Sequence, residues 1–264
     1  GVSGARVTKA GSDTLTLSGV FGTQSTAPLE LDATAGALVL SGGQKNLTGT
    51  NTWDVPVTLA SGTVHLHGGT INGSGTITTG ATAKFISRLN AGNVTVNNAI
   101  VAGDTLTIES PSGSNRLTIA GAISGTGGLS LIGNGAKSLD GANTYTGPTT
   151  ITAGNVRVNG SITNASTVTV GSGAQLGGHG TIDSMSTLQA GSTLSLVDGL
   201  GASALTFGKG LAVDSTSITQ WYLLSNTDAA GDAGATTGYS QTRVTGGDLT
   251  LASGATVNLN FQYT

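Results

Sequence analysis

Residues 43–68 read GQKNLTGTNTWDVPVTLASGTVHLHG, and residues 135–160 read GAKSLDGANTYTGPTTITAGNVRVNG. The two 26-residue stretches align without a gap at an offset of 92 positions. Chance matches of Gly and Thr are common in a chain with 44 glycines, but Pro56 also meets Pro148, and the chain has only four prolines. Self-similarity at a fixed offset is typical of repeat proteins, whose units stack on their neighbours. The repeat therefore favours a stacked scaffold over a compact enzyme with one site.

Short β-strands are predicted along most of the chain, because polar and apolar residues alternate with a period of two. Residues 63–66 (TVHL), 105–108 (TLTI) and 256–261 (TVNLNF) are examples of such runs. The runs are rich in β-branched residues and separated by Gly, Ser, Asn or Asp, which is the signature of strands. No segment keeps helical spacing over several turns. We predict a nearly all-β fold.

The repeat favours a parallel β-solenoid among the all-β folds. The offset of 92 equals four times 23, and a solenoid coil takes about 20–25 residues, so we expect about 11 coils of ~23 residues. Asn51 and Asn143, like Pro56 and Pro148, are then predicted to share one corner of the cross-section, four coils apart. Three Asn-Gly pairs favour hairpins, so an antiparallel sandwich or barrel is the competing fold.

The alternation also assigns side chains to the inside or the outside of a coil. We predict that Val64, Leu66, Val156 and Val158 point inward, and that His65, His67 and Arg157 point outward.

Two pairs of residues that meet in the alignment are predicted to stabilise the coils. Asn51 and Asn143 are expected to bond the backbone of a turn, since Asn tolerates left-handed conformations and closes turns. Trp53 and Tyr145 are expected to pack against the next coil, with sugar binding on an exposed sheet as the alternative.

The composition changes near residue 214. We expect solenoid repeats over residues 1–213 and terminal coils of the same solenoid over 214–264. Residues 218–224 (ITQWYLL) are the densest apolar and aromatic stretch, whereas residues 225–238 are rich in Gly, Ala, Thr and Asp. The latter composition predicts a protruding loop.

Charge and cysteine content narrow the classes of partner. Charged residues make up 9% of the chain and the net charge is −3, which gives no reason to expect nucleic acid or an anionic membrane. The absence of cysteine excludes disulfides and thiolate metal sites. The first residues, GVSGARVTKAG, lack the apolar core of a secretory signal, and no run approaches the ~18 apolar residues of a membrane helix. We therefore expect a mature segment or an excised fragment that does not itself insert into a membrane.

His65 and His67 lie on one predicted strand face, roughly 7 Å apart along the chain. A third ligand from a neighbouring coil would complete a metal site. The aligned positions in the second copy hold Arg157 and Asn159, which carry no imidazole. We therefore expect two exposed polar histidines and predict no metal site, while His179 stands alone among glycines.

The carboxylates offer two further candidate sites. Glu30 and Asp32 share a predicted strand face, and glycoside hydrolysis needs two carboxyl groups ~5–9 Å apart. We expect these two to be solvated surface acids and predict no catalytic residues. Asp228 and Asp232 offer oxygen ligands for Ca²⁺, but without the spacing of an EF-hand, so a solvated loop is expected. No nucleotide loop or nucleophile elbow is present, so no cofactor is expected.

The second copy of the repeat resembles the autotransporter-associated β-strand repeat. The motif L-S-G-x-N-T-Y-T-G-x-T-x-I-x-x-G-x-L-x-V is matched by residues 138–158, with a degenerate copy at 47–66 and a lead-in at 122–129. Residues 239–259 are similar to the passenger segment that precedes the membrane barrel of that family. The resemblance implies a right-handed parallel β-helix on the bacterial outer surface, active in adhesion, autoaggregation or biofilm formation, without conserved catalytic residues.

The sequence thus predicts an extracellular structural or adhesive segment that is not an enzyme. Its expected partners are other cell surfaces, glycans or further copies of itself, contacted through exposed Ser, Thr and Asn. The alternative is a β-helical polysaccharide hydrolase or lyase, or a glycan-binding protein resembling phage tailspikes. Acidic residues gathered from successive coils would favour that alternative.

Overall fold

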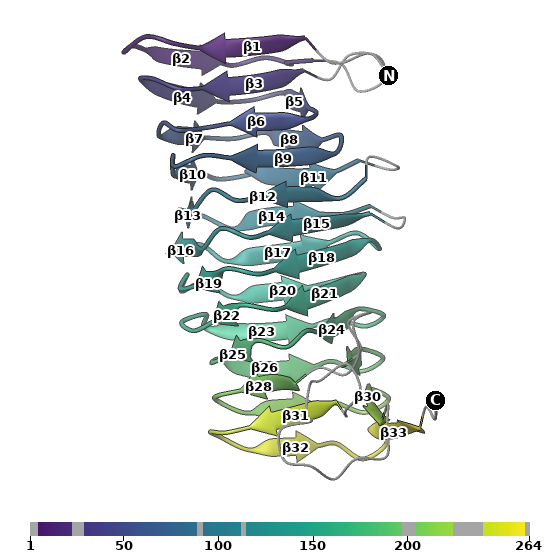
Figure 1. Ribbon diagram of the computed structural model, residues 1–264. Coiled ribbons are helices and arrows are strands. Elements are labelled where there is room, and N and C mark those ends of the chain that lie inside the picture. The colour runs from purple at the N-terminus through teal and green to yellow at the C-terminus, as the bar shows by residue number, and fades with distance from the viewer. Residues whose placement is uncertain are drawn as a thin grey trace.

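The chain forms a rod of stacked coils, as Figure 1 shows. The computed structural model describes residues 5–22, 29–88, 92–111, 115–196, 204–223 and 240–261. All secondary structure in these ranges is β-strand, and every strand pair between neighbouring coils is parallel. The predicted β-solenoid is confirmed, and the antiparallel alternative is wrong.

From β3 onward, each coil contributes one strand to each of three faces, because strands three apart in the chain are neighbours. The first two strands, β1 and β2, pair two strands on, with β3 and β4. Face 1 consists of a six-stranded and a five-stranded sheet, and the second continues the first, since the amide of Thr144 donates to the carbonyl of Ile123 at 2.7 Å. The strands of face 1 are β2 (Thr14–Leu17), β4 (Ala37–Leu40), β7 (Val57–Leu59), β10 (Ile77–Thr79), β13 (Ile100–Ala102), β16 (Ile123–Gly125), β19 (Ala142–Asn143), β22 (Ser161–Ile162), β25 (Thr181–Ile182), β28 (Ala204–Phe207) and β31 (Gln241–Val244).

Face 2 is one ten-stranded sheet, and face 3 is another ten-stranded sheet that the pair β1 and β3 extends. The strands of face 2 are β5 (Gln44–Leu47), β8 (Thr63–Leu66), β11 (Lys84–Ser87), β14 (Leu106–Glu109), β17 (Leu129–Ile132), β20 (Thr149–Ile151), β23 (Thr167–Val170), β26 (Met185–Leu188), β29 (Leu211–Val213) and β32 (Leu249–Leu251). Those of face 3 are β1 (Arg6–Lys9), β3 (Glu30–Ala33), β6 (Thr50–Thr52), β9 (Gly69–Asn72), β12 (Val94–Val96), β15 (Arg116–Ile119), β18 (Ala136–Leu139), β21 (Asn155–Val158), β24 (Gln175–Gly177), β27 (Thr193–Ser195), β30 (Ile218–Leu223) and β33 (Thr256–Phe261).

The length of a coil varies along the rod. On face 2, Lys45 pairs with Val64, 19 positions later, whereas Val213 pairs with Leu251, 38 positions later. The predicted number of about 11 coils is close to the ten strands of face 2, and the predicted length of ~23 residues lies within the observed range of coil lengths. Strands β29 to β33 continue the three faces, and the predicted loop at 225–238 lies outside the described residues.

The two copies of the repeat occupy different faces, so the prediction that they share a corner is wrong. The first copy begins with β5 on face 2, and the second begins thirteen strands later with β18 on face 3. Thirteen strands are four coils plus one strand. Asn51 therefore lies on face 3 and Asn143 on face 1. The motif fits one strand, a corner and the next strand, and its two copies occupy two different corners of the coil.

The core consists of inward rows that run along the rod. Val64, Leu66, Val156 and Val158 are each at most 2% exposed, which confirms their predicted inward orientation. Each stacks on an apolar or small residue of the next coil, as Val64 does on Phe85. This continuous stack of buried aliphatic side chains is the main stabilising term of the fold.

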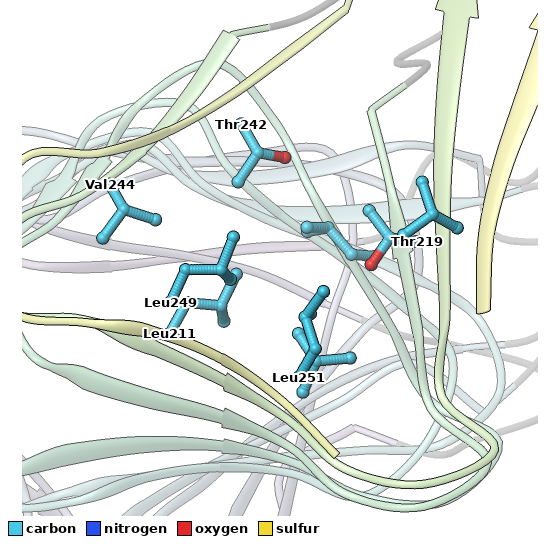
Figure 2. Close-up of a pocket in the computed structure, with 9 residues that line it drawn as sticks. Leu211, Thr219, Thr242, Val244, Leu249 and Leu251 are labelled. Carbon is cyan, nitrogen blue, oxygen red and sulfur yellow. The ribbon is translucent and has the colours of Figure 1, made fainter. Parts of the chain in front are cut away.

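The inward residues of the last described coil are only partly covered by other described residues. Figure 2 shows a pocket there, in which side chains from all three faces point toward one another. Leu249 and Leu251 of β32 and Val244 of β31 lie on one side of the pocket, and Thr219 of β30 lies on the other. Leu249 and Leu251 are each 51% exposed, so inward residues of the last coil remain in contact with solvent.

Candidate functional site

A row of hydroxyl side chains follows the outside of face 2. Register pairs each member with the next: Thr107, Ser130, Thr150, Thr169 and Thr187. We call these five residues the hydroxyl ladder. They alternate with buried residues on the same strands, most of them aliphatic, so their side chains point outward. Five members span four strand spacings, which is about 19 Å.

The hydroxyl ladder carries no charge. It is as long as the row of Thr50, Thr70, Thr95, Thr118 and Ser138 on face 3, whose last member is buried. The corresponding row of face 1 is interrupted by Val39 and Val101. On face 3 the row of hydroxyls ends at Arg157, which pairs with Ser138. Each hydroxyl both donates and accepts hydrogen bonds, so the ladder offers repeated contacts to hydroxyl or amide groups of a partner. Single contacts of this kind are weak, but a row of them binds through multivalency.

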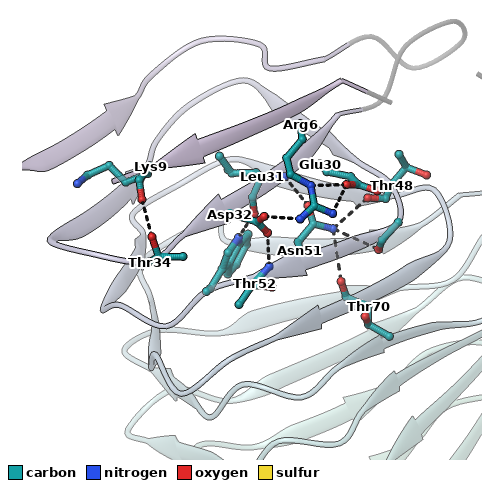
Figure 3. Close-up of polar contacts among 12 residues, drawn as sticks. Arg6, Lys9, Glu30, Leu31, Asp32, Thr34, Thr48, Asn51, Thr52 and Thr70 are labelled. Atoms are coloured by element: carbon teal, nitrogen blue, oxygen red, sulfur yellow. Dashed lines mark hydrogen bonds and ion pairs between the residues drawn. The ribbon is translucent and has the colours of Figure 1, made fainter. Parts of the chain in front are cut away.

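Glu30 and Asp32 of β3 belong to a structural network with Arg6 of β1, which Figure 3 shows. Arg6 donates to Glu30 through Nε at 2.8 Å and to Asp32 through Nη1 at 2.8 Å. The other oxygen of Asp32 accepts the backbone amide of Thr52 at 2.7 Å. Asp32 is only 6% exposed, so its predicted position as a solvated surface acid is wrong. The two carboxylates contact Arg6, and Asp32 also contacts the backbone of the next coil. The hydrogen bond to Glu30, followed by the charges of Asp32 and Glu30, raises the pKa of Arg6.

His65 is buried, so the prediction that its side chain is exposed is wrong. It pairs with Asn46 and Ile86 on either side, and all three side chains are at most 8% exposed. An outward position in the middle of a row is covered when bulky neighbours stack against it. Burial, with a smaller contribution from the charge of Arg88, lowers the pKa of His65 to about 4. His65 is therefore neutral at pH 7.

The metal site that the sequence analysis considered but did not expect at His65 and His67 has no third ligand among the described residues. His67 is half-buried, and its Nε2 lies 3.4 Å from the amide oxygen of Asn46. Burial lowers the pKa of His67 as well. Across the described part of the chain, no group of three or more His, Asp or Glu side chains could hold a metal ion. His179 is exposed, and Asp228 and Asp232 lie outside the described residues.

A surface ion pair joins Lys84 to Glu109 on the outside of face 2. Lys84 also pairs in register with Thr107, the first member of the hydroxyl ladder. The ion pair therefore marks the end of the uncharged surface.

Trp53 and Tyr145 pack inside the rod, as predicted, and the alternative of sugar binding is wrong. Both side chains are 0% exposed. The indole of Trp53 donates to the carbonyl of Leu31 at 2.8 Å, and the hydroxyl of Tyr145 lies 2.5 Å from Oγ1 of Thr149. Burial raises the pKa of Tyr145. Both polar groups are satisfied internally, which is why aromatic residues with polar ends are tolerated in this core.

Three lysines whose position was not predicted from the sequence lie in the interior of the rod. Lys9, Lys45 and Lys137 are at most 8% exposed. Each ammonium lies at a corner and donates to backbone carbonyls; that of Lys45 bonds Gly19 and Gly42, both at 2.6 Å. Lys137 bonds Ile132 and Gly135, both at 2.9 Å. Burial lowers the pKa of Lys137 to about 8. These lysines satisfy corner carbonyls and are not available to a ligand.

Comparison of the chain with known protein families, curated proteins and solved structures found no match. A search of the described residues for a helix long and apolar enough to cross a membrane also found none.

Proposed function

We propose that the chain is an extracellular structural and adhesive segment of a bacterial surface protein. The observation that carries the proposal is the uncharged hydroxyl ladder on a stiff rod, which suits repeated weak contact with glycans, another cell surface or a second rod. The resemblance of residues 138–158 to a surface repeat supports the same role. The rod presents the ladder, and affinity comes from the number of simultaneous contacts.

The acidic residues give the alternative of a glycan-cleaving enzyme little support. Glu30 and Asp32 are bound to Arg6, and Glu109 is bound to Lys84. A general acid needs a carboxyl group that can contact the substrate, and these three carboxyl groups already contact a cationic side chain of their own chain.

The test combines adhesion and turnover. Beads coated with the purified chain are scored for clumping across salt concentrations, and the same chain is incubated with bacterial and plant polysaccharides while reducing ends and unsaturated products are assayed. We expect clumping that depends weakly on salt, because few screened charges lie at the contact, and no turnover. Turnover that disappears when a carboxylate pair is replaced would overturn the proposal.

A matched pair of variants tests whether the hydroxyl ladder makes the contact. Thr150→Val with Thr169→Val removes two ladder hydroxyls and keeps the β-branched shape. Thr58→Val with Thr78→Val makes the same change on face 1, where both residues are exposed. The first pair should reduce clumping and the second should leave it unchanged. Equal loss in both pairs would mean that face 2 is not the contact surface.

A further inference from the structure

Three successive coils in the middle of the rod form a polar depression at the corner between face 2 and face 3. Strands β17, β20 and β23 enter this corner, and strands β18, β21 and β24 leave it (Figure 1). The depression has a volume of about 300 Å³, which is the lower end of the range for small-molecule sites. Its lining consists of Asn134, Gly154, Asn155, Gly173 and Gln175, so every side chain in it is a carboxamide. All residues of the three corners belong to the described part of the chain.

Two glycines keep the space between the carboxamides open. A Cβ atom at Gly154 would lie 2.5 Å from the backbone oxygens of Gly133 and of Gly135, so the close approach of neighbouring coils requires glycine there. A Cβ atom at Gly173 would meet no atom within 4 Å, which places this residue beside free space. Neither position carries a side chain that fills the depression, so a ligand can reach the carboxamides on either side.

The three carboxamides are not used to hold the coils together. Asn134 and Gln175 are exposed and Asn155 is half-buried, and within the described part of the chain none of their side-chain amides makes a hydrogen bond. Asn143 and Asn159, by contrast, bond neighbouring coils through theirs. A free carboxamide has two N–H donors and an oxygen with two acceptor sites, so it suits a partner that offers both donors and acceptors. Register pairs Asn155 with Gln175, so these two lie one strand spacing apart, about 4.8 Å.

The charges near the depression do not favour an acidic ligand. Lys137 of β18 is 0% exposed, and its ammonium already bonds the carbonyls of Ile132 and Gly135. Arg116 and Arg157 lie on face 3 near the depression but outside its lining. The lining itself carries no charge, so a ligand that fits it is polar and neutral.

We propose that this depression binds a short stretch of a neutral glycan. Each hydroxyl group of a sugar both donates and accepts hydrogen bonds, which matches a set of free carboxamides and needs no charged side chain. The ladder residues Ser130, Thr150 and Thr169 lie on β17, β20 and β23, so the same three coils offer hydroxyls on face 2 just before the corner. A glycan that crosses the corner contacts both rows, and each added contact strengthens binding. The inference rests on the adhesive function proposed above and names its ligand class.

Two double variants separate the depression from exposed amides elsewhere on the rod. Asn134→Ala with Gln175→Ala removes two carboxamides from the lining. Asn164→Ala with Gln189→Ala removes the same two groups from positions outside the lining. Both double variants should fold, because all four residues are exposed. The first should bind a neutral glycan about tenfold more weakly, since it loses hydrogen bonds of about 1 kcal/mol each, and the second should bind as the wild type does.

The measurement is a titration of the protein with cello-, malto-, manno- and xylotetraose, followed by NMR of the side-chain amide groups. With at least one of these neutral glycans, the NH₂ signals of Asn134, Asn155 and Gln175 should shift together and saturate, equally at low and high salt. Tetragalacturonic acid is the acidic comparison. The proposal is overturned if no neutral tetrasaccharide gives a saturable shift of these signals, or if only the acidic one binds and does so with a strong dependence on salt.

The bead assay distinguishes this inference from the adhesive function on which it rests. Clumping of coated beads without any shift of the three NH₂ signals overturns the glycan site and leaves the adhesive function standing. Turnover of a glycan that depends on a carboxylate pair overturns the adhesive function, whereas the shifts at the three carboxamides report binding alone.

Discussion

Asn143 should be one of the most sensitive polar positions in the rod, because its side chain joins three successive coils. Its Oδ1 accepts the amide of Ile123 at 3.0 Å, and its Nδ2 donates to the carbonyls of Gly141 and Ser161, both at 2.9 Å. The side chain is 1% exposed. Asn143→Ala leaves the amide of Ile123 without an acceptor, at a cost of about 1–3 kcal/mol, and removes two donated bonds worth about 1 kcal/mol each. We expect the free energy of unfolding to fall by about 3–5 kcal/mol.

Urea unfolding followed by circular dichroism measures that loss. When the wild type and the variant have the same dependence of unfolding free energy on urea concentration, the shift of the unfolding midpoint reports the change in stability. Asn164→Ala is the matched control, because Asn164 is exposed and makes one long bond of 3.5 Å to Thr144. Its cost should be about 0.5 kcal/mol or less. Hydrogen exchange at the amide of Ile123 should accelerate in the first variant only. If the two variants unfold at the same urea concentration, the three bonds of Asn143 do not hold the coils together and the reasoning is wrong.

Three further outcomes follow from buried side chains. Val156→Asp should lower the free energy of unfolding by several kcal/mol, because Val156 is 0% exposed and the new carboxylate would be unpaired. Asn155→Asp, at the half-buried neighbour, should cost little, and equal melting temperatures of the two variants would show that the inward register is wrong. Between pH 8 and 10.5, Lys137 keeps its proton in the unfolded chain but has released it in the folded chain. The free energy of unfolding should therefore rise with pH by on the order of 2 kcal/mol, and the same rise in a Lys137→Met variant would contradict this. Between pH 6.5 and 4 unfolded His65 binds a proton while folded His65 stays neutral, so stability should fall by on the order of 1–3 kcal/mol as the pH drops, and His65→Gln should flatten that slope in a pH series of thermal melts.

The alternation of residue types was enough to predict the interior of the strands. Val64 and Leu66 are inward as expected, because a period of two leaves only one choice once the apolar side is known. Asn51 was also predicted correctly to bond a turn: its Nδ2 donates to the carbonyl of Thr48 at 3.1 Å. These features depend on local sequence, which is why sequence reasoning reaches them.

The interior lysines were missed because lysine on a strand is ordinarily outside. A signal was present, since Lys45 lies two positions before the inward Leu47, and Lys137 lies two positions before Leu139. The period of two therefore placed both lysines inside. The corner carbonyls that bind the ammonium groups could not be predicted, because they come together only where the chain turns at Gly42 or Gly133. The burial of His65 was missed for a related reason, because it depends on which residues flank it in adjacent coils.

The position of the two repeat copies could not be read from their spacing, and the bonds of the two asparagines explain why. The Oδ1 of Asn51 accepts the amide of Leu31 at 2.7 Å, just as Asn143 accepts that of Ile123, yet the two residues lie on different faces. The motif needs a strand before the corner, a strand after it and a coil on either side. Each corner of a three-sided coil can supply these, so the repeat is a unit of one corner rather than of one coil. An offset of 92 residues therefore fits thirteen units of about seven residues, each a strand with the turn that follows it, as well as four coils of 23. Only the pairing of strands distinguishes the two.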